Sequence, residues 1–211
     1  MKALRALVLA MAIALPGTAG SAPAPDDGFT PLLDRSLDGW TVENTTPEKF
    51  SLTDGVLRTE GPDGWLRSPK RYGNFRLRFE FRFLAENSDS GVFLRAAGTG
   101  LFMRGWPNES YQVQLLKPTD PTARFPGVGG LFRHGRPPGE TRFDRADAQR
   151  LAKGVGDWQT LEVEAVGSKV TIWFNGQLLS VSEGVDPAPG FIGFQGEVGQ
   201  VEYRDIRIKE L

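Results

Sequence analysis

A run of alternating apolar and polar residues in the last third of the chain constrains the fold more than any other feature. From Trp158 the sequence reads WQTLEVEAVGSKVTIWFNGQLLSVSEG, and from Phe191 it reads FIGFQGEVGQVEYRDIRIKEL. Successive side chains of a β-strand point to opposite faces, so alternation with a period of two is typical of half-buried strands. The dipeptide Asn175-Gly176 separates two such runs and favours the positive φ angles of a tight hairpin turn. We therefore predict consecutive β-hairpins and an all-β sandwich.

The most regular alternation lies at 75–83, where Phe and Leu alternate with Arg and Glu. This pattern predicts a central strand with one face in the core and a charged face in water. Shorter patterns predict strands at 92–95 and 111–116 and a hairpin around Asp54-Gly55. In the last strand the alternation shifts phase after Asp205, as it does at a β-bulge.

Between about 117 and 153 the alternation is lost, and Arg, Pro and Gly dominate the sequence. Only 130–133 is a candidate strand there. Long irregular stretches in compact domains are usually functional or mobile. No internal repeat and no second domain is recognisable, so we predict a single domain over 29–211.

The first 22 residues have the composition of a signal peptide. Lys2 and Arg5 form a positive segment, 6–15 is apolar, and 16–22 holds small residues suited to cleavage. About ten apolar residues are too few to span a bilayer, so we expect cleavage and no membrane anchor. The protein is then exported, periplasmic or secreted, with a Pro-rich leader at 23–28. Because the chain has no Cys, the exported domain must rely on core burial rather than on disulfides.

The charge balance excludes one class of partner. The formal net charge is -1, and a weakly acidic domain lacks the basic surface that binds nucleic acid. Small or neutral molecules are the expected partners. The sequence shows no Ser-His-Asp spacing, no phosphate loop and no Glu-x-Asp-x-x-Glu strand of ordinary β-glucanases, which disfavours glycosidase action by paired carboxylates.

Eight segments in a fixed order carry a resemblance to a known family. They are LDGW (37–40), DGVL (54–57), YGNFRLRFEFR (72–82), DSGVFLR (89–95), YQVQLL (111–116), GDWQTLEVEAVGSKVTIWFNGQ (156–177), GFIGFQ (190–195) and VEYRDIRIKEL (201–211). Together they resemble the 3-keto-disaccharide hydrolases, also described as 3-keto-glucoside lyase/hydratase domains and formerly as domain of unknown function 1080. The resemblance implies a concanavalin A-like jelly-roll sandwich, commonly exported by bacteria. Three positions depart from the family pattern: Asp89 replaces a usual Asn, Gln112 a frequent Glu, and Asp205 a frequent Asn.

The resemblance also implies a reaction. In a glycoside whose 3-hydroxyl is oxidised to a ketone, the proton on C2 is acidic. A base removes it, the C1–O bond leaves by β-elimination, and water adds to the resulting 2-hydroxyglycal. Such chemistry needs a base, an acid for the leaving oxygen, and a donor or metal that polarises the ketone.

We expect the acid/base residues to come from Asp89, Glu80 and His134, in that order. Each has a structural alternative. Glu80 lies among arginines, as in a charge ladder on a solvated strand face. Asp89 opens a strand in a tight turn, where Asx-turn bonding is common. His134 is the only His and could be an isolated loop residue on the surface.

Binding of the sugar is predicted for a second group: Arg95, Gln112, Gln114, Gln195 and Trp106. Amides suit hydroxyls because they both donate and accept, whereas a polar outward face is the alternative for the two glutamines of 111–116. Arg95 could instead pair with Glu80 or Asp89. Gln195 shares a face with a glycine, which leaves room for a ligand or for close packing. Trp106 could stack on a sugar or cover the core edge.

These residues do not identify a cofactor, and a divalent cation such as Ca²⁺ is one candidate. Oxygen atoms near Asp89, including those of Glu86 and Asn87, could hold Ca²⁺, but their spacing matches no known loop. We therefore expect an exported hydrolase or lyase that cleaves 3-keto-glycosides. The alternative is a non-catalytic, lectin-like carbohydrate-binding module, which a concave sandwich face with amides, Arg and Trp serves equally well. The oligomeric state is not encoded in any pattern.

Overall fold

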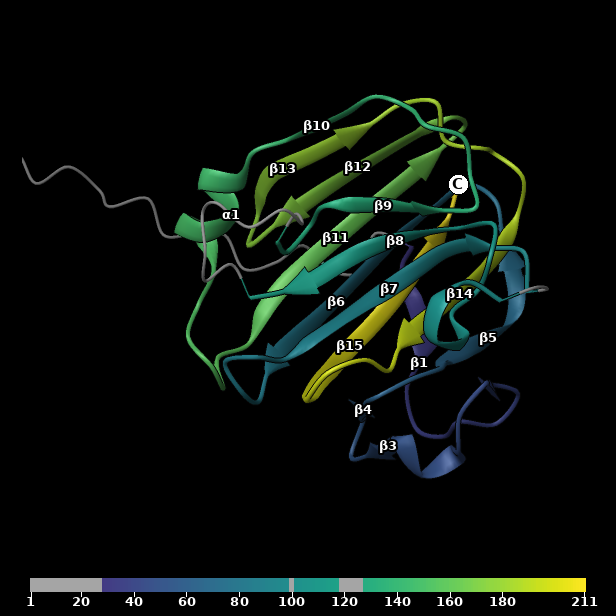
Figure 1. Ribbon diagram of the computed structural model, residues 1–211, viewed down its shortest axis with the longest axis vertical. Helices are drawn as coiled ribbons and strands as arrows, with labels where there is room; N and C mark the ends of the chain where they lie inside the picture. Colours follow the sequence, from purple (N-terminus) through teal and green to yellow (C-terminus); the bar gives the residue numbers. More distant parts are fainter. Residues whose placement is uncertain (1–27, 99–100, 118–126) are drawn as a thin grey trace, which may run out of the picture.

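The alternating segments form two antiparallel β-sheets that pack face to face (Figure 1). The computed structural model describes residues 28–98, 101–117 and 127–211. Residues 1–27, which hold the predicted signal peptide and most of the leader, lie outside the described residues, so export stays a prediction. Within the described ranges, no helix combines the length and the apolar character that crossing a membrane requires.

One sheet has nine strands. Its order is β10 (Thr141–Phe143), β13 (Gln177–Ser182), β12 (Lys169–Phe174), β11 (Gln159–Val166), β6 (Phe75–Phe83), β15 (Gln200–Glu210), β4 (Val56–Glu60) and β3 (Phe50–Thr53), with β1 (Thr30–Leu33) also paired to β15. The central strand β6 buries its five apolar side chains and leaves its Arg and Glu side chains half-exposed, as the alternation predicts.

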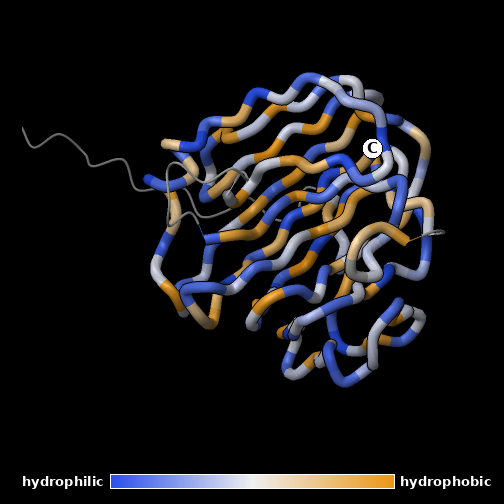
Figure 2. The backbone as a smooth tube through the Cα atoms, viewed as in Figure 1, coloured by the Kyte–Doolittle hydropathy of each residue, from blue (hydrophilic) through white to orange (hydrophobic). Residues whose placement is uncertain are grey.

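The other sheet has six strands. Its order is β2 (Thr41–Glu43), β5 (Trp65–Tyr72), β14 (Gly190–Gln195), β7 (Asp89–Ala96), β8 (Ser110–Leu116) and β9 (Leu131–His134). The hydrophobic core lies between the two sheets and contains, among others, Phe79, Phe81, Val113 and Phe194. Figure 2 shows the alternation of apolar and polar residues along the strands that produces it. The predicted all-β sandwich is thereby confirmed.

The turns follow the local sequence signals. Asn175 and Gly176 have φ angles of 47° and 80° between β12 and β13, and Asp54 and Gly55 have 50° and 75° between β3 and β4. At Asp205, φ is 48° and the pairing of β15 with β6 shifts register. Both predicted hairpins and the predicted bulge are therefore present.

The stretch at 117–153 contains more regular structure than its sequence predicts. Besides β9 it holds β10 and the helix α1 (Arg145–Leu151), which lies at one end of the sandwich (Figure 1). Asp144 caps this helix by accepting a hydrogen bond of 2.8 Å from the backbone N–H of Asp147. Elements of three and seven residues are too short to show a clear period, so sequence analysis missed them. Two 3-10 turns, η1 (Pro47–Lys49) and η2 (Met103–Gly105), complete the described elements.

Candidate functional site

A pocket of about 310 Å³ lies on the outer face of the six-stranded sheet. Phe93, Gln112 and Phe132 are direct partners across β7, β8 and β9, so their side chains share this face. Val113 lies on the opposite face, in the core. The pocket is lined by Asp89, Phe102, Met103, Trp106, Gln112, Gln114, Leu116, Phe132, Arg133, His134 and Glu197.

Three glutamines form a hydrogen-bonded amide row on this face: Gln112, Gln114 and Gln195. The Nε2 atom of Gln112 donates to Oε1 of Gln114 at 2.6 Å and to Oε1 of Gln195 at 2.9 Å. At the end of the row, Nε2 of Gln114 donates to Oδ1 of Asp89 at 2.6 Å. The carboxylate is therefore oriented by the amide row.

Gly91 makes room for the amide row. It is the cross-strand partner of Gln114. A Cβ atom at this position would lie 2.5 Å from Nε2 of Gln112 and 2.8 Å from Oε1 of Gln195. The glycine after Asp89-Ser90 is thus required by the close approach of two amide side chains, not by a turn.

His134 ends β9 and contacts Gln112, the middle member of the row. Its Nε2 atom lies 2.7 Å from Oε1 of Gln112. Both hydrogens on Nε2 of Gln112 are already donated to Gln114 and Gln195, so its Oε1 must accept. The network thus assigns the proton of a neutral His134 to Nε2 and leaves a lone pair on Nδ1.

Aromatic rings surround the imidazole of His134. The ring centroids of Phe102, Phe93, Trp106 and Phe132 lie 4.6, 6.0, 6.2 and 6.2 Å from its own. The residue is only 6% exposed, and burial lowers the pKa of His134 from 6.5 to about 4. It is therefore neutral near pH 7, and its lone pair can accept a proton.

A second carboxylate enters the pocket from the segment between β14 and β15. The backbones of Asp89 and Val198 form a β-bridge, with N–H to O distances of 2.9 and 3.1 Å. This bridge places Glu197 in the pocket beside Asp89. Sequence analysis missed Glu197 because it lies in a Gly-rich turn without alternation. Only its position two residues after Gln195, a predicted site residue, could have indicated Glu197 from the sequence.

Trp106 belongs both to the pocket and to a small cluster beneath it. It packs with Trp65, Phe93 and Ala96, while Phe102 packs against this cluster from the segment at 101–109. Its Nε1 atom is buried and has no hydrogen-bond partner among the residues that the structure describes, and the same holds for Nε2 of Gln195. Trp106 therefore covers the edge of this cluster and also lines the pocket, and its stacking on a sugar stays a prediction. Phe102, Met103, Leu116, Phe132 and Arg133 were not predicted as lining residues.

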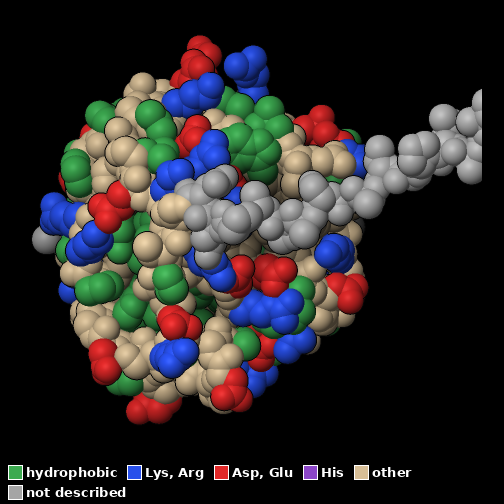
Figure 3. Space-filling view, turned by 180° about the vertical axis from the view of Figure 1, so that it is seen from behind, with side chains coloured by type: hydrophobic (Ala, Val, Ile, Leu, Met, Phe, Trp, Pro, Cys, Tyr) green, Lys and Arg blue, Asp and Glu red, His purple; other side chains and the backbone are tan. Residues whose placement is uncertain are grey.

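Glu80 lies outside this site. It is on β6, on the outer face of the nine-stranded sheet, where it accepts a hydrogen bond of 2.6 Å from Nε of Arg204. Similar pairs join Arg82 to Glu202 and Arg78 to Glu162. Figure 3, the view from behind, shows such basic and acidic side chains side by side. Glu80 is therefore part of a cross-strand charge ladder, and its expected place in the site is corrected.

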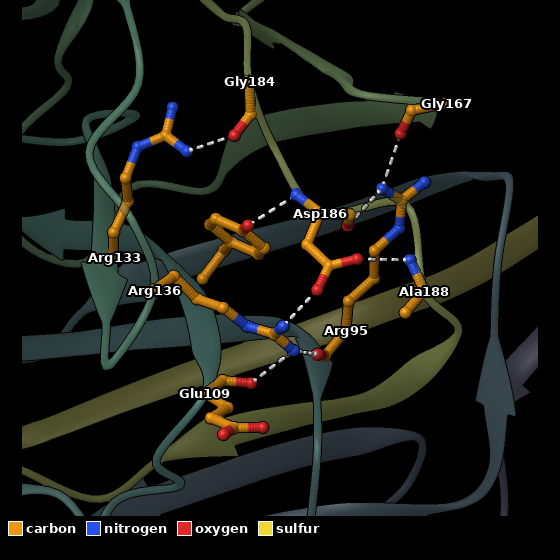
Figure 4. Close-up of polar contacts among 9 residues, drawn as sticks. Arg95, Glu109, Arg133, Arg136, Gly167, Gly184, Asp186 and Ala188 are labelled. Carbon is orange, nitrogen blue, oxygen red and sulfur yellow. Dashed lines mark hydrogen bonds and ion pairs between the residues drawn. The ribbon is translucent and has the colours of Figure 1, made fainter.

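Arg95 also lies elsewhere. Arg95 is 1% exposed. Its guanidinium donates to the backbone oxygens of Gly167 and Asp186 at 2.7 and 3.0 Å (Figure 4), and to that of Gly73 at 2.8 and 3.0 Å. Its φ angle is 49°, so the strand alternation ends before it and the side chain leaves the face used by Phe93. The prediction that Arg95 binds the sugar is corrected. It joins the loops at one end of the sandwich.

The described residues do not contain a group of three or more His, Cys, Asp or Glu that could hold a metal ion. Glu86 is paired with Lys117. The groups in the pocket that can bind hydroxyls or exchange protons include carboxylates, amides and one imidazole.

The sequence matches one family, described as 3-keto-alpha-glucoside-1,2-lyase-like domain, over residues 28–209. Among curated proteins, none matches the chain.

Solved structures resemble the fold at low identity. A candidate glycosyl hydrolase from Parabacteroides distasonis is 21% identical, with 87% of this chain and 99% of that chain covered and a TM-score of 0.65. The carbohydrate binding module CBM66 from Bacillus subtilis is 11% identical, with coverage of 86% and 99% and a TM-score of 0.57. The β-glucanase of Bacillus licheniformis is 16% identical, with coverage of 87% and 97% and a TM-score of 0.52. These likenesses confirm the concanavalin A-like jelly-roll sandwich.

Proposed function

The chain belongs to the family of 3-keto-alpha-glucoside-1,2-lyase-like domains, and from this premise we propose that it cleaves 3-keto-glycosides by β-elimination and hydration. Family membership ties the chain to carbohydrate chemistry. The observation that carries the finer proposal is the hydrogen-bonded line in one pocket from Asp89 through Gln114 and Gln112 to His134. It holds two proton acceptors at the ends of a row of amides that suits a sugar.

In the first half-reaction Asp89 acts as the base. Its carboxylate takes the proton from C2, which the neighbouring C3 ketone acidifies, and the electron pair forms the C1=C2 double bond as the C1–O bond breaks. The same proton then passes from Asp89 to the leaving oxygen, so an alcohol departs and Asp89 returns to its starting state. Gln114 orients the carboxylate by its hydrogen bond to Oδ1.

In the second half-reaction His134 activates water. The lone pair on Nδ1 takes a proton from water as its oxygen adds to C1. The imidazolium gives that proton up to solvent water, and Asp89, which lies at C2, takes a proton from water and delivers it to C2. A neutral imidazole is needed for this step, and the burial that lowers the pKa of His134 supplies it. The net change is glycoside plus water to 3-keto-sugar plus alcohol.

Gln114 has a further hydrogen-bond donor for the sugar. Its Nε2 atom carries two hydrogens, and the hydrogen bonds found among the described residues use only the one directed to Asp89. The second can be donated to an oxygen of the sugar bound over the row.

Release of free sugar from 3-keto-disaccharides, compared with their unoxidised parents, tests the proposal with purified residues 23–211. Turnover confined to the keto substrates is expected. Asp89→Asn should lower kcat at least about 100-fold while binding remains, and Glu80→Gln, a carboxylate outside the pocket, is the matched control with unchanged kcat. Equal turnover of the parents contradicts the proposal, and binding of both sets without turnover assigns the lectin-like role instead.

A further inference from the structure

The pocket has an apolar end that the reaction itself does not use. Phe102, Met103 and Trp106 line it from the loop at 101–109, and Phe132 lines it from β9. The Phe102 ring lies 4.6 Å from the imidazole of His134, so these side chains gather at the His134 end of the hydrogen-bonded line that starts at Asp89. The opposite end of the line is the carboxylate of Asp89.

Two residues of this loop expose apolar side chains to an unusual degree. Met103 is 63% exposed while it also lines the pocket, and Leu101, two residues before it, is 65% exposed. Leu101 forms a β-bridge with Pro107, which closes the loop around η2. Exposed apolar side chains at the rim of a polar pocket are typical of a surface that a ligand covers.

The length of the amide row separates the two ends. Gln112 and Gln114 are two residues apart on β8, which corresponds to about 7 Å along a strand. A sugar whose C2 lies at Asp89 and whose C1 faces the water activated by His134, as the second half-reaction requires, directs the group on C1 along the row. That group reaches His134, Phe102 and Met103.

The chemistry of this end selects among leaving groups. A second sugar would place hydroxyls against the carbon and sulfur atoms of Phe102 and Met103, and a hydroxyl that loses water without a new hydrogen bond is destabilising. An apolar group would instead gain from covering the same side chains. Arg133 does not change this balance, because its guanidinium donates to the backbone oxygens of Glu183 and Gly184.

We infer that the preferred substrates are 3-keto-glucosides of apolar alcohols rather than 3-keto-disaccharides, with the apolar leaving group bound by Met103 and Phe102. The inference rests on the proposed function, because it assigns the leaving-group side of the same pocket. It adds a specificity-determining residue, Met103, which contacts no reacting atom.

The test compares two substrates with alkyl leaving oxygens: cyclohexylmethyl 3-keto-α-glucoside and maltose oxidised at C3 of its non-reducing glucose. The cyclohexylmethyl alcohol is the poorer leaving group, so a preference for it reports binding rather than leaving ability. We expect its kcat/KM to be about tenfold higher. Met103→Gln, of similar size, should lower that preference about fivefold, whereas Leu178→Gln, at another exposed apolar residue, should leave it unchanged.

Equal or better turnover of the keto-maltose, or a preference that Met103→Gln leaves intact, overturns the inference while the proposed function stands. If neither substrate is turned over, the proposed function fails, and dissociation constants of the same two compounds decide the inference. A tighter cyclohexylmethyl glucoside that Met103→Gln weakens supports the apolar surface, and equal affinities overturn it.

Discussion

The Nε2 atom of His134 lies 2.7 Å from Oε1 of Gln112, and this contact sets the state of the only histidine in the chain. The amide can only accept at this atom, because its nitrogen already donates twice. A neutral acceptor gives an imidazolium no opposite charge, and the surrounding rings remove water. Burial thus keeps His134 neutral, and the contact with Gln112 fixes which ring nitrogen carries its proton.

Gln112→Glu should favour the protonated form of His134 instead of the neutral one. A carboxylate beside Nε2 favours the imidazolium, and Gln195 can turn its amide so that Nε2, now without a partner, donates to the new acceptor. We expect the pKa of His134 to rise from about 4 to above its usual 6.5. NMR titration of the imidazole measures this directly, since the chain has a single His. Glu80→Gln should leave the titration unchanged, and a pKa still near 4 in Gln112→Glu contradicts the assigned contact.

Because His134 is buried in its neutral form, we expect the stability of the fold to depend on pH. Between pH 6.5 and about pH 4 the unfolded chain binds a proton at His134 that the folded chain does not, so lowering the pH through this window destabilises the fold. At pH 5 this contribution is about 2 kcal/mol relative to pH 7.5. In His134→Gln it is absent, so denaturant unfolding at the two pH values should show a drop smaller by that amount. An identical drop in both proteins excludes His134 as the cause.

Sequence analysis can predict the structural features that depend on the local alternation of apolar and polar residues. The five apolar side chains of β6 and the Asn175-Gly176 turn lie where their pattern places them. On the same grounds Gln112, Gln114 and Gln195 were expected on ligand-facing strand faces, and the structure brings them into one row. A strand face is set by the parity of nearby residues, so sequence alone can identify its members.

What depends on irregular backbone could not be predicted. Parity counted from Phe93 fails at Arg95 because its φ is 49°. Glu80 has the parity of an exposed residue, but only the pairing of β6 with β15 shows that Arg204 is its partner. Glu197 reaches the pocket through a single β-bridge between Asp89 and Val198, and pairing between distant segments leaves no local signal.

Gly91→Ala should disrupt the amide row. The added Cβ atom would lie 2.5 Å from Nε2 of Gln112, so Gln112 must move and its contact with His134 is lost. We expect a loss of about 1 to 3 kcal/mol in unfolding free energy and a lower kcat on 3-keto substrates. Gly73→Ala is the control, because its Cβ atom would meet Pro189 at an ordinary 3.5 Å. Unchanged activity and stability in Gly91→Ala would show that the row can shift without consequence.

Arg95→Met separates a structural role from a role in the site. Arg95 donates to three backbone oxygens, and Arg136 in turn binds the Arg95 backbone oxygen, that of Glu109 and the carboxylate of Asp186 (Figure 4). Methionine fills the volume but donates to none of these oxygens, so the carbonyls of Gly73 and Gly167 lose their charged partner. Buried acceptors left without a donor destabilise the fold, and we expect a loss of about 3 kcal/mol measured by denaturant unfolding.

Below its melting temperature the Arg95→Met variant should keep kcat/KM on 3-keto substrates within about twofold of the parent, because changes away from the reacting atoms leave transition-state binding intact. Arg78→Met is the matched control. Arg78 pairs with Glu162 on the half-exposed outer face, where one ion pair contributes less than about 1 kcal/mol, so neither stability nor turnover should change much. If Arg95→Met instead retains its stability and loses turnover, Arg95 binds the substrate, and the loops that it joins must open toward the pocket during the reaction.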